Sequence, residues 1–142
     1  MTGAKMSAAE LRKFLHVEFP QAFANGDISI ESADGETCKV RQRYNDRMLR
    51  PGGTISGPTL MGLADCAMYV VVLSAIGPIG LAVTTNLNIS FLRKGPPGYD
   101  ILARARLLKL GKRLAVGEVN LFSGFSSDPI AHVTATYSIP DK

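Results

Sequence analysis

Residues 56–77 read SGPTLMGLADCAMYVVVLSAIG, a long apolar segment that carries a single charged side chain. Ser56 is a favoured helix N-cap, and Pro58 lies in the first turn, where its missing N–H costs nothing. Gly77 followed by Pro78 is a helix stop signal. Because the segment is apolar nearly all round, the helix should be buried on every side. Its one carboxylate, Asp65, is costly to bury unless a partner satisfies it.

The same segment is just long enough to be considered as a membrane span. Residues 59–76 are 18 mostly apolar residues, close to the minimum for crossing a bilayer. Asp65 near the centre, Pro58 and Gly77 at the ends, and the strand-like sequence that follows all argue against that interpretation. The N-terminus has no apolar core of the kind found in signal peptides. We therefore expect a soluble, cytoplasmic protein that binds no membrane.

Periodicity predicts one short helix and six strands around this segment. Ser7 to Glu10 form a capping box, and Leu11 and Leu15 follow at helical spacing until Pro20 ends the helix. The strands are expected at 28–32, 37–44, 81–92, 99–110, 113–123 and 130–139. An antiparallel sheet of this kind must curl around the long helix to bury it. The prediction is therefore an α+β hot-dog fold.

Length and charge narrow the class of protein further. The 142 residues fit one domain over 1–142, with a short tail at 1–6. Lys and Arg number 16 against 12 Asp and Glu, and the net charge of +4 suits an anionic ligand. The basic residues are dispersed without interleaved aromatics, so no nucleic acid is expected. Cys38 and Cys66 lack metal-ligand spacing, so no metal is expected. We interpret them as buried thiols in a reducing compartment, with a disulfide as the less favoured alternative.

Two residues of the long helix are candidates for chemistry. Gly57 lies two turns before Asp65 on the same face, in the first turn, where backbone N–H groups have no helical partner and the helix dipole is positive. An N–H group there can hold the negative charge that develops on a carbonyl oxygen. The alternatives are a structural carboxylate at Asp65, satisfied by its neighbours, and simple packing at Gly57.

Three stretches of the chain resemble a known family. RPGGTISGPTLMGLADCAMYVVVLSAIG at 50–77, LAVTTNLNISFLRKG at 81–95 and LLKLGKRLAVGEVNLF at 107–122 are similar to the hot-dog acyl-CoA thioesterases of the phenylacetate-pathway type. The resemblance covers roughly residues 10–140. It implies hydrolysis of an acyl- or aryl-CoA thioester without a cofactor, coenzyme A being part of the substrate. It also implies Gly57 as oxyanion donor, Asp65 as general base or nucleophile, and Thr84 as a holder of the water.

The helix motif departs from the family pattern in three places. Arg50 replaces an amide residue, Ser56 replaces a histidine and Pro58 replaces a glycine. A guanidinium has no lone pair with which to accept a bond from water, so we expect Arg50 to grip the ligand or to pair with Asp65. Ser56 is interpreted as an N-cap beside the substrate rather than as a nucleophile. These departures leave open a second class, a non-catalytic acyl-CoA-binding protein.

Further substrate contacts are expected from polar side chains elsewhere. Tyr69 shares the helix face of Asp65, and a polar run in an otherwise apolar strand suits either a pocket edge or an ordinary sheet surface. Basic residues at strand ends suit the phosphates of coenzyme A, although solvated strand ends are the simpler interpretation of each. The polar run is Thr84, Thr85 and Asn86, and the basic set is Arg93, Lys94, Lys112 and Arg113.

The spacing of Gly57 and Asp65 also predicts assembly. Eight residues span roughly 12 Å along a helix, so one thioester carbonyl cannot touch both groups of the same chain. If both act on one substrate, Gly57 of one chain must face Asp65 of another about a two-fold axis. We therefore expect a homo-oligomer, either a dimer or a dimer of dimers.

Overall fold

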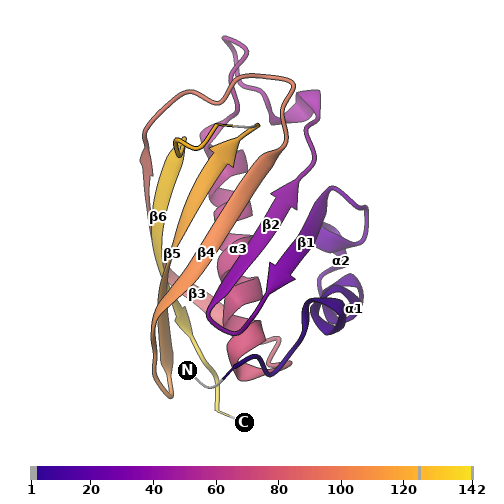
Figure 1. The fold of residues 1–142 in the computed structure, drawn as a ribbon, viewed down its shortest axis with the longest axis vertical. Coiled ribbons are helices and arrows are strands. Elements are labelled where there is room, and N and C mark those ends of the chain that lie inside the picture. Colours follow the sequence, from indigo (N-terminus) through magenta and orange to yellow (C-terminus); the bar gives the residue numbers. More distant parts are fainter. Residues whose placement is uncertain (1–2, 125, 142) are drawn as a thin grey trace.

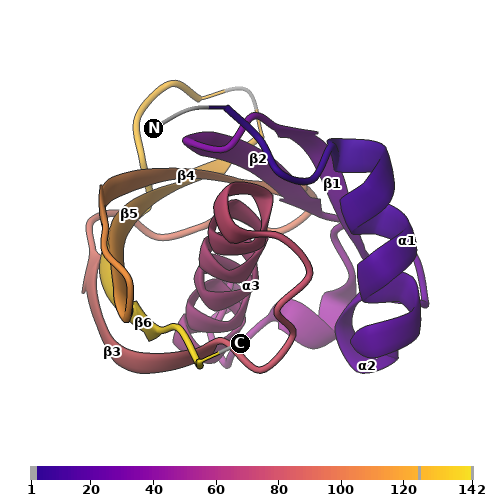
Figure 2. The ribbon, with the colours of Figure 1, turned by 90° about the horizontal axis from the view of Figure 1, so that it is seen from below.

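The computed structural model describes residues 3–124 and 126–141, which form one antiparallel sheet wrapped around a long helix. The helices are α1 (Ala8–Glu18), α2 (Pro20–Phe23) and α3 (Gly57–Ile76), with a 3-10 turn at Asp46–Met48. The strands are β1 (Ile28–Ala33), β2 (Thr37–Gln42), β3 (Val83–Phe91), β4 (Ile101–Leu110), β5 (Leu114–Ser123) and β6 (Ala131–Ser138). Their order in the sheet is β1-β2-β4-β5-β6-β3. Seen end-on, the sheet curls around α3 (Figure 2), which confirms the α+β hot-dog prediction.

The central helix forms where its sequence signals predicted it. Ser56 Oγ accepts a hydrogen bond from the Thr59 N–H at 3.3 Å, and Gly77 ends the helix with a φ of 98°, which favours glycine. The helix is long and apolar enough to cross a membrane, yet 67% of its most apolar window is buried inside the protein. It is therefore the core helix of the domain.

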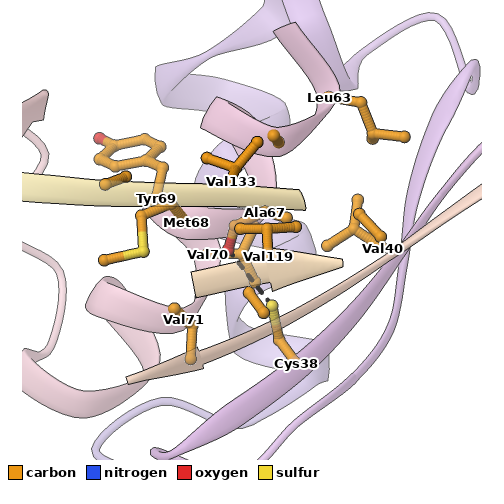
Figure 3. Close-up of a cluster of buried hydrophobic side chains, with 14 of the residues drawn as sticks. Cys38, Val40, Leu63, Ala67, Met68, Tyr69, Val70, Val71, Val119 and Val133 are labelled. Atoms are coloured by element: carbon orange, nitrogen blue, oxygen red, sulfur yellow. Dashed lines mark hydrogen bonds between the residues drawn. The ribbon is translucent and has the colours of Figure 1, made fainter. Parts of the chain in front are cut away.

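The core is packed closely where α3 meets the sheet (Figure 3). A Cβ atom on Gly117 of β5 would lie 2.7 Å from Met68 Sδ and 2.8 Å from the Arg106 carbonyl oxygen, so only glycine lets the helix approach here. From β2, the Cys38 thiol donates to the Ala67 carbonyl oxygen of α3 at 3.2 Å. Burial raises the pKa of this thiol to about 12, which keeps it neutral.

Most element boundaries agree with the sequence prediction to within two residues. The capping box is present, with Ser7 and Glu10 each accepting from the other's N–H. Pro20 ends α1 as expected, but it also begins α2, because proline needs no N–H partner at a first helical position. The tail is anchored rather than loose, since the Lys5 N–H donates to the Ser74 carbonyl at 2.8 Å and Met6 is buried. Residues 1–2 of the expected tail lie outside the described residues.

The two edges of the sheet differ in their surroundings (Figure 1). α1 lies alongside β1, and the Arg12 guanidinium donates twice to the Ile30 carbonyl of that strand, at 2.8 and 3.0 Å. No strand lies beyond β3 in the described part of the chain. Val83 and Phe91, at the two ends of β3, are more than half exposed. The β3 edge is therefore open, with an exposed apolar side chain at each end of the strand, whereas the β1 edge is covered.

Candidate active site

Asp65 lies half-buried on α3 and accepts hydrogen bonds from two strands. Thr84 Oγ1 of β3 donates to its Oδ1 atom at 2.5 Å. The Tyr137 hydroxyl of β6 lies 2.8 Å from the same Oδ1 atom and 3.0 Å from the Asp65 carbonyl oxygen. The cost of placing this carboxylate beside the core is thus offset by two hydroxyl donors.

A β-bulge in β3 places Thr84 on Asp65. Leu87 of β3 pairs with Ala135 of β6, but the register then shifts, so that Thr84 rather than Thr85 pairs with Tyr137. Directly paired residues of an antiparallel sheet point to the same face. The inserted residue, Thr85, turns outward and donates to the Thr136 carbonyl at 3.2 Å. Thr84 and Tyr137 therefore reach α3 side by side, an example of a bulge that redirects a side chain.

A cavity of about 360 Å³ opens in front of Asp65. Its wall is aromatic: the Tyr69 and Tyr137 rings are stacked at 6.1 Å, and Phe19 meets Tyr69 edge-on at 6.3 Å. The Tyr69 hydroxyl donates to the Gly80 carbonyl at 2.7 Å, which fixes the ring. Burial, with the charge of Glu18, raises the pKa of Tyr69 above its ordinary value. This cavity joins an aromatic surface to two carboxylates, those of Asp65 and Glu18.

Gly57 lies in a second cavity, of about 410 Å³, at the N-terminal end of α3. Arg50, Arg93 and Lys94 line the same cavity and bring three cations to it. The Phe91 ring covers the glycine, because a Cβ atom on Gly57 would lie 3.1 Å from its Cζ atom. First-turn N–H groups beside cationic side chains suit an anion or a polarised carbonyl oxygen.

The basic residues grouped as one set in the sequence lie at two different ends of the sheet within a chain. Arg93 and Lys94 follow the end of β3 at Phe91, which pairs with Ala131 of β6. Lys112 and Arg113 lie in the hairpin that joins β4 and β5, at the opposite end of the sheet (Figure 1). About eight strand residues, or roughly 26 Å, separate the two ends.

The remaining predicted residues lie outside the two cavities or play a local role. Thr85 and Asn86 line neither cavity, and Asn86 accepts from the Asn88 side chain at 2.7 Å. Ser56 borders Gly57 as the N-cap. Arg50 lies with Gly57 and forms no ion pair with Asp65 among the described residues.

Among the described residues, the other titratable side chains do not form a second catalytic or metal site. His132 bonds Glu118 at 3.0 Å on the outer sheet face. Hydrogen bonds from Arg106 and His132 lower the pKa of Glu118. Cys66 is a free thiol beside Asp65 on α3, and burial raises its pKa to about 12. No group of three His, Cys, Asp or Glu side chains that could hold a metal occurs among the described residues.

Two residues of the site were missed by sequence reasoning. Tyr137 lies 72 residues from Asp65, within the strand expected at 130–139, where it belongs to the set of alternating apolar residues. Phe91 ends β3 and reads as an ordinary apolar strand residue. The signal that could have found Tyr137 is its hydroxyl, because a buried tyrosine needs a hydrogen-bond partner. Asp65 was the carboxylate expected in the core that still needed a hydrogen-bond partner, so the two residues could have been matched.

Comparisons with known proteins agree with this architecture. The sequence profile of the thioesterase superfamily matches residues 52–125. A candidate thioesterase from Silicibacter sp. TM1040 is 43% identical, with a TM-score of 0.88, over 97% of this chain and 94% of that one. The PaaI protein of the E. coli phenylacetic acid degradation operon is 25% identical, with a TM-score of 0.75, over 92% of this chain and 96% of its own.

A hypothetical thioesterase from Streptococcus pneumoniae TIGR4, solved with coenzyme A, shares the fold. It is 22% identical, with a TM-score of 0.77, over 93% of this chain and 98% of that chain. None of the curated proteins matched the chain.

Proposed function

Because the chain belongs to the thioesterase superfamily, we propose that it hydrolyses an acyl- or aryl-CoA thioester, with Asp65 as the base. The observation that carries the proposal is the half-buried Asp65 carboxylate, held by Thr84 and Tyr137 at the mouth of an aromatic cavity. A carboxylate oriented by hydroxyl donors beside an apolar wall suits water activation next to an acyl group. Two free thiols fit a reducing cytoplasm.

The proposed reaction needs only water and the protein's own groups. The Asp65 carboxylate takes a proton from water as the water oxygen bonds to the thioester carbonyl carbon. The charge that develops on the carbonyl oxygen is held by the Gly57 N–H. When the tetrahedral intermediate collapses, the carbon–sulfur bond breaks, and the coenzyme A sulfur leaves and takes up the proton. The products are a carboxylic acid and free coenzyme A.

Two copies of the chain would complete the site. Gly57 and Asp65 occupy separate cavities of one chain, roughly 12 Å apart along α3. The open β3 edge, with Val83 and Phe91 exposed, is the surface on which we place the second copy. A two-fold axis at this edge sets the two α3 helices antiparallel. Gly57 of one copy then faces Asp65 of the other, so a dimer holds two sites.

The cationic cavity around Gly57 is the proposed place for the coenzyme A phosphates. Arg93 and Lys94 follow β3 there, and Arg50 faces them. A guanidinium can bind phosphate through two hydrogen bonds. The coenzyme A solved with the pneumococcal protein of the same fold supports this class of ligand.

The decisive experiment is a turnover assay on a panel of acyl- and aryl-CoA esters, with free thiol release as the readout. Asp65→Asn keeps hydrogen bonding but cannot take a proton, so hydrolysis should fall by roughly 10²–10⁴-fold while coenzyme A binding persists. Thermal unfolding and calorimetric binding serve as controls for the fold. Undiminished turnover by the variant would remove Asp65 from catalysis. Binding of acyl-CoA without any turnover by the natural protein would assign it to the non-catalytic binding class.

A further inference from the structure

We propose that Tyr137 is a positioning residue, which together with Thr84 holds Oδ1 of Asp65 so that Oδ2 alone takes the proton from water. This inference rests on the proposed thioester hydrolysis. The hydroxyls of both residues donate to the same oxygen, Oδ1, at 2.8 Å for Tyr137 and 2.5 Å for Thr84. The three residues come from β6, β3 and α3, and the bulge at Thr85 brings them together.

The chemistry of a carboxylate makes the two oxygens unequal here. Each oxygen offers about two lone pairs, and two donors fill those of Oδ1. No hydrogen bond or ion pair reaches Oδ2 from the described residues. The cavity of about 360 Å³ adjoins Asp65, so a water molecule can approach Oδ2 from that side. The free oxygen is the one left to accept a proton.

The surroundings of Tyr137 keep its hydroxyl group protonated, so that it remains a hydrogen-bond donor. Its ring stacks on Tyr69 and is buried, and its strand position is fixed by pairing with Thr84. Burial and the charge of Asp65 raise the pKa of Tyr137 well above its ordinary value, so its hydroxyl keeps its proton through any working pH. A hydroxyl held on a strand orients a carboxylate more firmly than one on a loop.

The other titratable groups around Asp65 decide how a pH profile can be read. Tyr69 and Cys66, both on α3, have raised pKa values because of burial and stay neutral below pH 8. Glu18 of α1 lines the same cavity and carries the other carboxyl group there. Glu18→Gln therefore serves to identify the group behind the acid limb, which should remain in that variant.

Tyr137→Phe keeps the ring and removes the donor. We expect kcat to fall by roughly 10- to 100-fold with KM little changed, the usual range for losing a hydrogen bond to a charged group. One donor fewer favours the neutral carboxylic acid, so the acid limb of kcat/KM should move to higher pH. Tyr44→Phe is the matched control, because the Tyr44 hydroxyl also donates to an aspartate, Asp46, at 2.9 Å on the surface. It should change neither quantity.

A second readout keeps this inference separate from the proposed function. Carbon-detected NMR of the Asp65 side-chain carboxyl follows its titration without any turnover. The midpoint should rise in Tyr137→Phe and in Thr84→Val, and should not move in Tyr44→Phe. A midpoint unchanged in Tyr137→Phe would overturn the positioning role, whatever the activity. Absence of hydrolysis by the natural protein, with the midpoint still shifted in Tyr137→Phe, would refute the proposed function and with it the assignment of Oδ2 as the proton acceptor.

Discussion

The two edges of the sheet are treated in opposite ways. At β1, helix α1 lies alongside the strand and Arg12 satisfies the Ile30 carbonyl. At β3, the strand ends in exposed Val83 and Phe91, and the described residues provide no cover. Edge strands invite pairing with another chain unless they are covered or charged. The contrast teaches that the chain blocks one edge and leaves the other open, and the open edge is the one on which we propose a second copy.

The open edge also carries residues of the candidate site. Thr84 belongs to β3, Phe91 covers Gly57, and Arg93 follows the strand. Strand β1 contributes no residue to either cavity, although Glu18 of α1, the helix beside it, lines the Asp65 cavity. A second copy placed on β3 would therefore complete the proposed active site. A second copy on β1 would form a dimer without contributing residues to that site.

The largest expected effect comes from mixing two inactive variants. Asp65→Asn removes the base, and Gly57→Pro removes the N–H donor, so each homodimer should lose at least about 100-fold in turnover. A mixed dimer carries both defects in one site and none in the other. Co-refolding should therefore restore up to half of the natural activity per mixed dimer.

This experiment depends on folded subunits and on exchange between them. Circular dichroism checks the fold of each variant, since the Phe91 ring must shift slightly to admit any side chain at Gly57. Differently tagged subunits, captured in sequence, show that mixed dimers form. Mixed dimers that remain inactive would show that Gly57 and Asp65 do not serve one shared site.

A smaller effect is expected from a charge placed on the open edge. Val83→Lys puts an ammonium group where β3 would meet its counterpart, once in each subunit. Val83 is 56% exposed in one chain, so its burial would occur only on association. We expect the dimer dissociation constant to rise by at least about tenfold, measured by sedimentation equilibrium.

Val17→Lys is the matched substitution on the covered side. Val17 lies on α1 and is 72% exposed, so the chemical change is the same and only the edge differs. It should leave the dissociation constant unchanged. Equal weakening by both variants, or by neither, would contradict the placement of the partner on β3.

The smallest effect concerns the two basic pairs. Replacing Arg93 and Lys94 together by Ala should weaken coenzyme A binding by up to about tenfold at low salt, and the difference should shrink as salt is added. The matched control replaces Lys112 and Arg113, which lie at the other end of the sheet. Calorimetric titration that shows equal losses for both pairs would indicate a general attraction rather than a site.

Much of the fold could be predicted because its signals are local. Ser56, Pro58 and Gly77 mark the ends of α3 through cap and turn chemistry, which depends on a few neighbouring residues. Strand existence followed from alternation, and boundaries moved by one or two residues where loops formed. The separation of Arg93 from Lys112 was not predicted, because it depends on which strand ends share an end of the sheet.

The candidate site was only half visible in the sequence. Asp65 stood out as a charge in an apolar helix, and Gly57 as a first-turn residue. Tyr137 could not be selected, since its contact with Asp65 depends on the pairing of β3 with β6. Only the family resemblance singled out Thr84 over Thr85, because a bulge leaves no mark on a run of polar residues.

The bulge at Thr85 shifts the register of β3 by one residue, so the residues before it face the opposite way from what simple alternation predicts. From Phe91 back to Leu87 the odd-numbered residues pair with the inward-facing positions of β6, whereas at Thr84 an even-numbered residue does. Counting backwards by twos from Phe91 arrives at Thr85, which points outward and bonds the Thr136 carbonyl. In an alignment with relatives, a single-residue gap at this point would therefore exchange the residue beside the carboxylate for one on the opposite face. Roles can be transferred along this strand only when the residues on both sides of residue 85 are aligned by their pairing with β6.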